Sequence, residues 1–153
     1  MEFIYIFIIS SVIAFLGLAG GVIASRSNKQ ELKPGKNYFI LIQKILFLAI
    51  FIASVIYFDL NIILSFIIIA IAFLFCFLRN LQKFSIIIYI LLGIILFLSS
   101  RIKQLFFLNC ALIFLFGIPT GTMIQMKKKN IIVEIMKHIG FFICILLFFI
   151  FSF

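Results

Sequence analysis

Residues 62–78 read IILSFIIIAIAFLFCFL, a stretch in which Ser65 is the only polar side chain. A helix made of these residues is apolar on every face, so no side of it suits water. Its length approaches the roughly 20 apolar residues that a helix needs to cross the hydrocarbon core of a bilayer. Similar runs recur along the chain, and we therefore expect an integral membrane protein built of helices.

The composition of the whole chain agrees with this interpretation. Of 153 residues, 67% are hydrophobic and 11% are charged, whereas a soluble domain has roughly 45–50% apolar and about 25% charged residues. The mean hydropathy is +1.43. Such a chain has too few polar side chains to cover a water-facing surface, which excludes an ordinary soluble protein.

Short charged intervals divide the chain into apolar runs, and these runs predict the membrane spans. The predicted fold is all-α, a polytopic bundle of transmembrane helices that forms a single integral membrane domain over 1–153. Transmembrane strands are a weaker alternative, because they are about ten residues long and alternate apolar with polar residues. The expected spans are about 3–24, 38–58, 62–78, 84–100, 105–126 and 131–153.

The last run decides between six spans and five. Its uncharged part, 139–153, has 15 residues, or about 22 Å of helix, against a hydrocarbon core of about 30 Å. If the helix begins at Ile131, Glu134, Lys137 and His138 occupy its first two turns at the level of the lipid headgroups. Six spans are the prediction, and five spans with a partial last helix are the alternative.

The basic residues predict the orientation of the bundle. The net charge is +9, from 13 Lys and Arg against 4 Asp and Glu. All basic residues except Arg101 and Lys103 fall on one side of the six-span arrangement, and the positive-inside rule places that side in the cytoplasm. We expect a protein of the cell membrane with both termini outside. Anionic lipid headgroups are the expected counterions, and nucleic acid is not an expected partner because the basic loops lack aromatic interleaving and a binding fold.

The first run carries small residues on one helical face, at Gly17, Gly21 and Ala24. This spacing lets two helix backbones approach closely. We expect a helix-packing surface whose partner is another helix of the chain, with a separate protein as the alternative. Positive charge follows this run instead of preceding it, so the run is expected to be an uncleaved span and not a signal peptide.

The fifth run contains the densest group of helix-disrupting residues in any span, Gly117, Pro119, Thr120 and Gly121. Pro119 cannot donate a hydrogen bond to the carbonyl of Leu115, so we expect the helix to kink or break there. A kink that serves packing is the favoured interpretation. The alternative is a solute site that includes Asn109 of the same helix, as in transporters with broken helices.

Glu134 and His138 lie four residues apart on one helical face, where a carboxylate and an imidazole can form an acid–base pair or bind a metal. A solvated pair at the headgroup level is favoured, because one His and one Glu make an incomplete metal site. Cys76, Cys110 and Cys144 lie in three different runs without a metal-binding spacing. We expect no cofactor and no metal, and the chain carries no recognised enzyme motif.

Basic residues in the loops are candidates for contacts with anionic lipid headgroups, namely Lys33, Lys36, Lys127, Lys128 and Lys129. Pro34 and Gly35 predict a type II turn that presents the first two of them. No ionisable residue is expected at the centre of the bilayer, which argues against a proton-coupled pump or an ion pathway.

These features favour a small multipass membrane protein with a non-catalytic role, a subunit or assembly partner of a membrane complex. Its expected partners are lipid and other membrane protein subunits. A transporter or channel for a small neutral or lipidic solute, using a broken helix at Gly117–Gly121, is the alternative. A third hypothesis is a lipid-modifying enzyme at the headgroup plane that uses Glu134 and His138.

Overall fold

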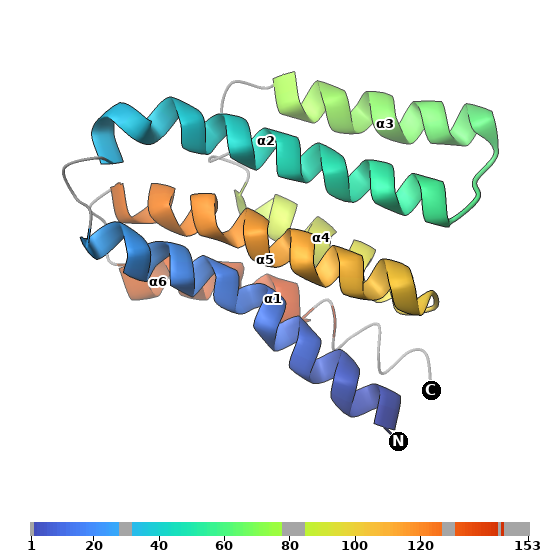
Figure 1. Cartoon of the computed structure of the whole chain (residues 1–153), viewed down its shortest axis with the longest axis horizontal. Coiled ribbons are helices and arrows are strands. Elements are labelled where there is room, and N and C mark those ends of the chain that lie inside the picture. The colour runs from blue at the N-terminus through green and yellow to red at the C-terminus, as the bar shows by residue number, and fades with distance from the viewer. Residues whose placement is uncertain (1, 28–31, 78–84, 127–130, 144, 146–153) are drawn as a thin grey trace.

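The part of the chain that the structure describes is helical. A computed structural model describes residues 2–27, 32–77, 85–126, 131–143 and 145. These residues form helices joined by short turns, with no strand among them, which confirms the prediction of helices over strands. In chain order they are α1 (Glu2–Ser27), α2 (Leu32–Tyr57), α3 (Ile62–Phe77), α4 (Ser85–Ser99), α5 (Lys103–Met126), α6 (Ile131–Met136) and the 3₁₀ turn η2 (Lys137–Ile139) (Figure 1).

Three of the described helices are long and apolar enough to cross a membrane, over Tyr5–Arg26, Pro34–Tyr57 and Lys103–Met126. α3 and α4 are apolar but shorter, with 16 and 15 residues, which corresponds to about 24 and 22 Å of helix. The helices therefore fit a helical membrane protein.

Helix boundaries follow the charges that punctuate the sequence. α1, α3, α4 and α5 begin and end within three residues of the predicted spans, but α2 begins at Leu32, six residues earlier than predicted. Pro34 lies in its first turn, where the missing N–H would have had no partner within the helix. Gly35 does not have a positive φ. The predicted type II turn at Pro34 and Gly35 is therefore wrong.

The turn between α2 and α3 is as short as the sequence predicts. Asp59 has φ 46°, a left-handed conformation that Asp adopts more readily than most residues. The last helical segment begins at Ile131 and continues as helix over 140–143 after η2. Its end lies outside the described residues.

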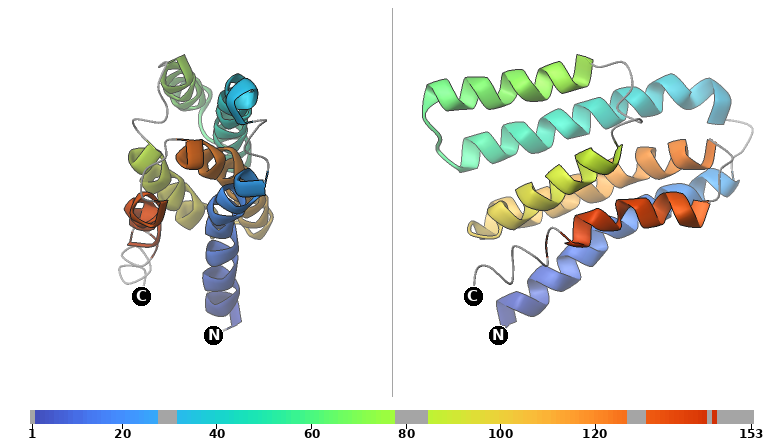
Figure 2. Two further views of the ribbon diagram at one scale, coloured as in Figure 1. Left: turned by 90° about the vertical axis from the view of Figure 1, so that its left-hand side faces the viewer. Right: turned by 180° about the vertical axis from the view of Figure 1, so that it is seen from behind.

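α5 is the central helix of the bundle. It packs most extensively against α1, next against α2, and then against α4. In the end-on view α5 lies among these helices, whereas α3 lies on the outside, beside α2 (Figure 2, left). α6 contacts α5, and the turn η2 that follows it contacts α4 (Figure 2, right). Thirteen residues of α5 are buried, Phe106, Ile113 and Phe116 among them.

Aromatic rings fill the space between α1, α4, α5 and the last helical segment. The Phe15 ring of α1 lies 6.0 Å from the Phe141 ring and 4.8 Å from the Phe142 ring, between centroids. Tyr89 of α4 lies 5.9 Å from Phe116 of α5. Separations of this size are those of favourable aromatic pairs, so these contacts tie residues 141–142 to the core.

Candidate functional site

Two glycine pairs form the contact between α1 and α5, which run in the same direction (Figure 1). A Cβ added to Gly17 would overlap the backbone carbonyl of Phe114, and one added to Gly21 would overlap that of Ile118. A Cβ on Gly117 or Gly121 would likewise meet the backbone of α1. The backbones are therefore in direct contact, and the partner of the first-run glycines is a helix of the same chain.

Ala24 does not belong to this contact. Its side chain is exposed, and the next residue, Ser25, is buried instead. The Ser25 hydroxyl donates a hydrogen bond of 2.8 Å to the carbonyl of Val22 within its own helix. The packing face of α1 thus follows Gly17 and Gly21 but leaves Ala24 on the outside.

Pro119 lies inside a continuous α-helix, so the helix does not break at Gly117–Gly121, as the alternative of a solute site in a broken helix supposes. The two threonines beside it bond to carbonyls of their own helix, Thr120 to Phe116 at 2.8 Å and Thr122 to Ile118 at 2.9 Å. The glycines on either side of Pro119 face the α1 backbone. This segment therefore packs closely against the backbone of α1.

Thr120 of α5 and Gln43 of α2 form a hydrogen bond between the two helices. The Gln43 side-chain Nε2 donates a hydrogen bond of 3.0 Å to the Thr120 hydroxyl, across 77 positions of sequence. Gln43 is 1% exposed, and Thr120 is also buried. A hydrogen bond between helices that is shielded from water holds α2 and α5 in register.

Tyr89 and His138 extend this group of polar side chains to α4 and η2. The His138 ring lies 4.8 Å from the Tyr89 ring, edge to face, and each residue is 1% exposed. The Tyr89 hydroxyl is near the Thr120 hydroxyl but falls short of hydrogen-bond geometry. Gln43, Tyr89, Thr120 and His138 therefore form one buried group, which we call the polar cluster.

The burial of His138 corrects the expectation that this residue is solvated at the headgroup level. His138 lies in the 3₁₀ turn η2, with exposed Lys137 and Ile139 on either side of it in the sequence. The turn packs against α4 and brings the imidazole against Tyr89. The Glu134 side chain lies outside the described part, so its pairing with His138 stays a prediction.

Within the polar cluster, Gln43 Oε1 and the Tyr89 hydroxyl have no hydrogen-bond partner among the described residues. The buried serine hydroxyls, in contrast, have partners. They donate hydrogen bonds of 2.7–2.8 Å to backbone carbonyls of their own helices, at Ser11, Ser54 and Ser99. A buried polar atom without a partner costs about 1–3 kcal/mol. The polar cluster therefore contains a buried acceptor and a buried hydroxyl that could each form a further hydrogen bond.

Asn109, predicted to share a solute site with Pro119, lies elsewhere in α5. Its Nδ2 donates a hydrogen bond of 3.2 Å to the Ser54 hydroxyl of α2. Eleven residues separate it from Thr120, or about 16 Å along the helix. Asn109 Oδ1 also lacks a partner among the described residues, but the fold does not bring it to the polar cluster.

Two described cavities are apolar and do not reach Pro119. A groove of about 430 Å³ lies between α2, α3 and α4, with Phe51, Ile68 and Ile95 in its lining. A second one of about 560 Å³ lies between α1 and α5, beside Ile13 and Phe107. Apolar hollows of this kind match the tails of lipids and offer little to a polar solute.

The structure describes few of the remaining predicted site residues, which are the basic residues of the loops and the cysteines. Lys36 is exposed near the start of α2, but the Lys33 side chain and the whole of 127–129 lie outside the described residues, so the lipid contacts stay a prediction. Cys110 is buried and free. The described residues contain no group of His, Cys, Asp and Glu that could hold a metal.

Sequence reasoning missed Gln43 and Tyr89 as members of a site. Two signals were present in the sequence, an uncharged amide within the second apolar run and a tyrosine away from the predicted membrane interfaces. Neither signal identifies a partner, because the contacts join residues from four different segments.

No family model matches this chain, and it has no match among curated proteins or solved structures. Its function is therefore argued from the site itself.

Proposed function

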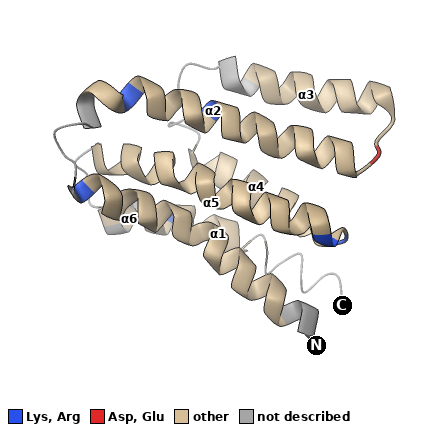
Figure 3. Ribbon diagram, in the orientation of Figure 1, with Lys and Arg blue, Asp and Glu red and all other residues tan. Residues whose placement is uncertain are grey.

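We propose that the chain is a six-span protein of the cell membrane with its basic loops in the cytoplasm and both termini outside. The positions of charge support this. Among the described residues, Arg26 lies in the last turn of α1 and Lys36 lies near the start of α2, both toward the left, whereas Arg101 and Lys103 lie at the turn before α5 on the right (Figure 3). Lys44 lies further along α2, and Lys137 lies in η2. The short helices α3 and α4 require only a modest adjustment of bilayer thickness.

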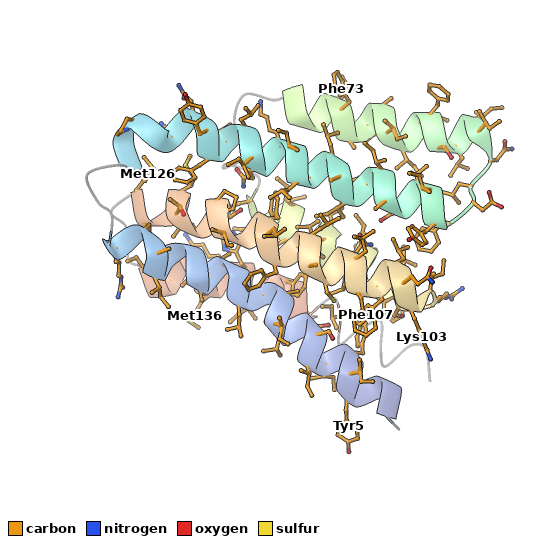
Figure 4. The ribbon with its side chains drawn as sticks, in the orientation of Figure 1. Tyr5, Phe73, Lys103, Phe107, Met126 and Met136 are labelled. Carbon is orange, nitrogen blue, oxygen red and sulfur yellow. The ribbon has the colours of Figure 1, made fainter. Side chains whose placement is uncertain are left out.

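Within this membrane arrangement we propose a non-catalytic role, as a subunit or assembly partner of a membrane complex. The observation that carries the proposal is the position of α3. Among the described helices, α2 is the only one against which α3 makes more than isolated contacts. Phe66 is 74% exposed, and Phe73 points away from the bundle (Figure 4). α3 therefore presents large apolar side chains, which another membrane helix can cover.

Paired substitutions on two exposed faces test this role. Phe66→Ala with Phe73→Ala removes bulk from α3, and the control Phe107→Ala with Leu115→Ala removes bulk from exposed positions of α5. Native gel electrophoresis of membranes solubilised in mild detergent gives the size of the complex. We expect the α3 pair alone to shift the protein to the size of a monomer. A wild-type protein that already runs as a monomer contradicts the proposal.

The polar cluster favours a second candidate function, the passage of a small neutral solute through the bundle. Buried hydrogen-bonding groups inside a membrane bundle commonly belong to substrate pathways. Glycerol uptake by proteoliposomes, measured by light scattering, tests this candidate. Uptake should exceed that of empty liposomes and should fall with Gln43→Leu. Uptake equal to that of empty liposomes removes this candidate and leaves the assembly role untouched.

A further inference from the structure

The hydrogen bonds of the polar cluster leave a defined pair of groups unused. The Thr120 hydroxyl has one hydrogen, which it donates to the carbonyl of Phe116, and its oxygen accepts from Gln43 Nε2. Gln43 Oε1 is then an acceptor in need of a donor. The Tyr89 hydroxyl, which can donate and accept a hydrogen bond, also has no hydrogen-bond partner among the described residues.

Both of these groups lie close to the side chain of one residue, Thr120. Gln43 reaches the Thr120 hydroxyl from α2, and Tyr89 approaches it from α4. Both side chains are 1% exposed, so bulk water does not reach them freely. In a membrane, groups of this kind are satisfied inside the protein, because lipid offers no hydrogen bonds.

We infer that the polar cluster binds a small neutral molecule that donates a hydrogen bond to Gln43 Oε1 and shares another with the Tyr89 hydroxyl. The mixture of an amide donor, an amide acceptor and a phenol suits a neutral molecule, since a cation would meet the Gln43 NH₂ group and an anion would meet its carbonyl oxygen. Water, or a short alcohol or polyol, has the required chemistry. A bound water typically has two to four polar partners, which the cluster can supply.

This inference concerns occupancy of the cluster and holds whether or not the chain is a subunit of a complex. It narrows the second candidate function to small neutral molecules with hydroxyl chemistry. Occupancy and passage are nevertheless separate properties. A molecule can be held in the cluster for the stability of the bundle without ever crossing the membrane.

Ultraviolet resonance Raman spectroscopy of Tyr89 tests the inference directly. The chain contains no Trp, and Tyr89 is one of 4 tyrosines. Tyr5, Tyr38 and Tyr57 are exposed, so their replacement by Phe leaves Tyr89 as the single tyrosine of a folded protein. The intensity ratio of the tyrosine Fermi doublet reports whether the hydroxyl is hydrogen bonded. The protein is measured in lipid nanodiscs, in buffer alone and with added glycerol.

We expect the ratio of a hydrogen-bonded hydroxyl. If it is present in buffer alone, water occupies the cluster; if it appears only with glycerol, the occupant is the larger polyol. Gln43→Leu removes the acceptor that holds the molecule and should shift the ratio to that of a free hydroxyl. A free hydroxyl in both media overturns the inference.

A hydrogen-bonded hydroxyl that Gln43→Leu leaves unchanged also overturns it, because Tyr89 is then bonded directly to a protein group such as Thr120. The Raman result and the result of the uptake assay are independent of each other. A bound molecule together with uptake equal to that of empty liposomes supports the inference and removes only the transport candidate.

Discussion

Replacing Gly121 with alanine tests the close contact between α1 and α5. A Cβ at this position overlaps the carbonyl of Leu18 and lies 2.9 Å from the amide nitrogen of Val22. Both are backbone atoms, which cannot rotate away as a side chain can. The two helices must therefore separate, and the contacts of the neighbouring glycines loosen with them.

The size of the effect follows from two opposing terms. Overpacking a tight interface costs typically 1–3 kcal/mol, and the higher helix propensity of alanine returns up to about 1 kcal/mol. We expect Gly121→Ala to lower the free energy of unfolding by about 1–2 kcal/mol. Gly20→Ala is the matched control, because no atom lies within 4 Å of an added Cβ there. The control should be neutral or stabilising by up to about 1 kcal/mol.

The thiol of Cys110 provides the assay. This residue is buried in the folded protein, so in a Cys76→Ala, Cys144→Ala background its reaction with a maleimide reports opening of the bundle. The reaction rate is followed in mixed micelles of a mild detergent and increasing SDS. A loss of about 1.4 kcal/mol appears as a tenfold rise in the open fraction. Equal effects of Gly121→Ala and Gly20→Ala would refute the packing argument.

Three further substitutions can be compared in the same assay. Thr120→Val removes the acceptor of Gln43 Nε2 and leaves the buried amide without its partner, so it should cost about 1–3 kcal/mol. Gln43→Leu removes the whole amide and should cost less than Thr120→Val; the reverse order contradicts the assignment of this hydrogen bond. His138→Ala should cost about 2 kcal/mol or more, because it opens a cavity beside Tyr89. Met136→Ala, at an exposed position two residues earlier, is the control and should change the free energy of unfolding by about 0.5 kcal/mol or less. Equal effects of His138→Ala and Met136→Ala would show that His138 is not packed in the core.

The boundaries of α1, α3, α4 and α5 could be predicted from the sequence because charged residues cannot lie within the hydrocarbon. The start of α2 could not be predicted in the same way. Pro34 and Gly35 fit a turn by their local preferences, but a proline is equally acceptable in the first turn of a helix. Local sequence does not distinguish a turn from the first turn of a helix, so it predicts a loop for the polar residues before Tyr38.

The candidate site was harder to predict because it depends on contacts between distant segments. The spacing of Gly17 and Gly21 indicates a packing surface, and packing is also the favoured interpretation of Gly117–Gly121, but no local pattern shows that these two segments are each other's partners. The polarity of His138 and the charges beside it predict a position at the level of the lipid headgroups. Its burial depends on the packing of η2 against α4, which no local pattern encodes.

The six-span arrangement with cytoplasmic basic loops is the central claim, and cysteine labelling in intact cells tests it most directly. In a background with all three native cysteines replaced by alanine, single cysteines are placed at Gln30, Asn61, Asn80, Ile102 and Asn130, and the cells receive a membrane-impermeant maleimide. We expect positions 61 and 102 to react in intact cells, and positions 30, 80 and 130 to react only after lysis. Reaction of position 30 or 130 in intact cells, together with protection of position 61, would contradict the arrangement.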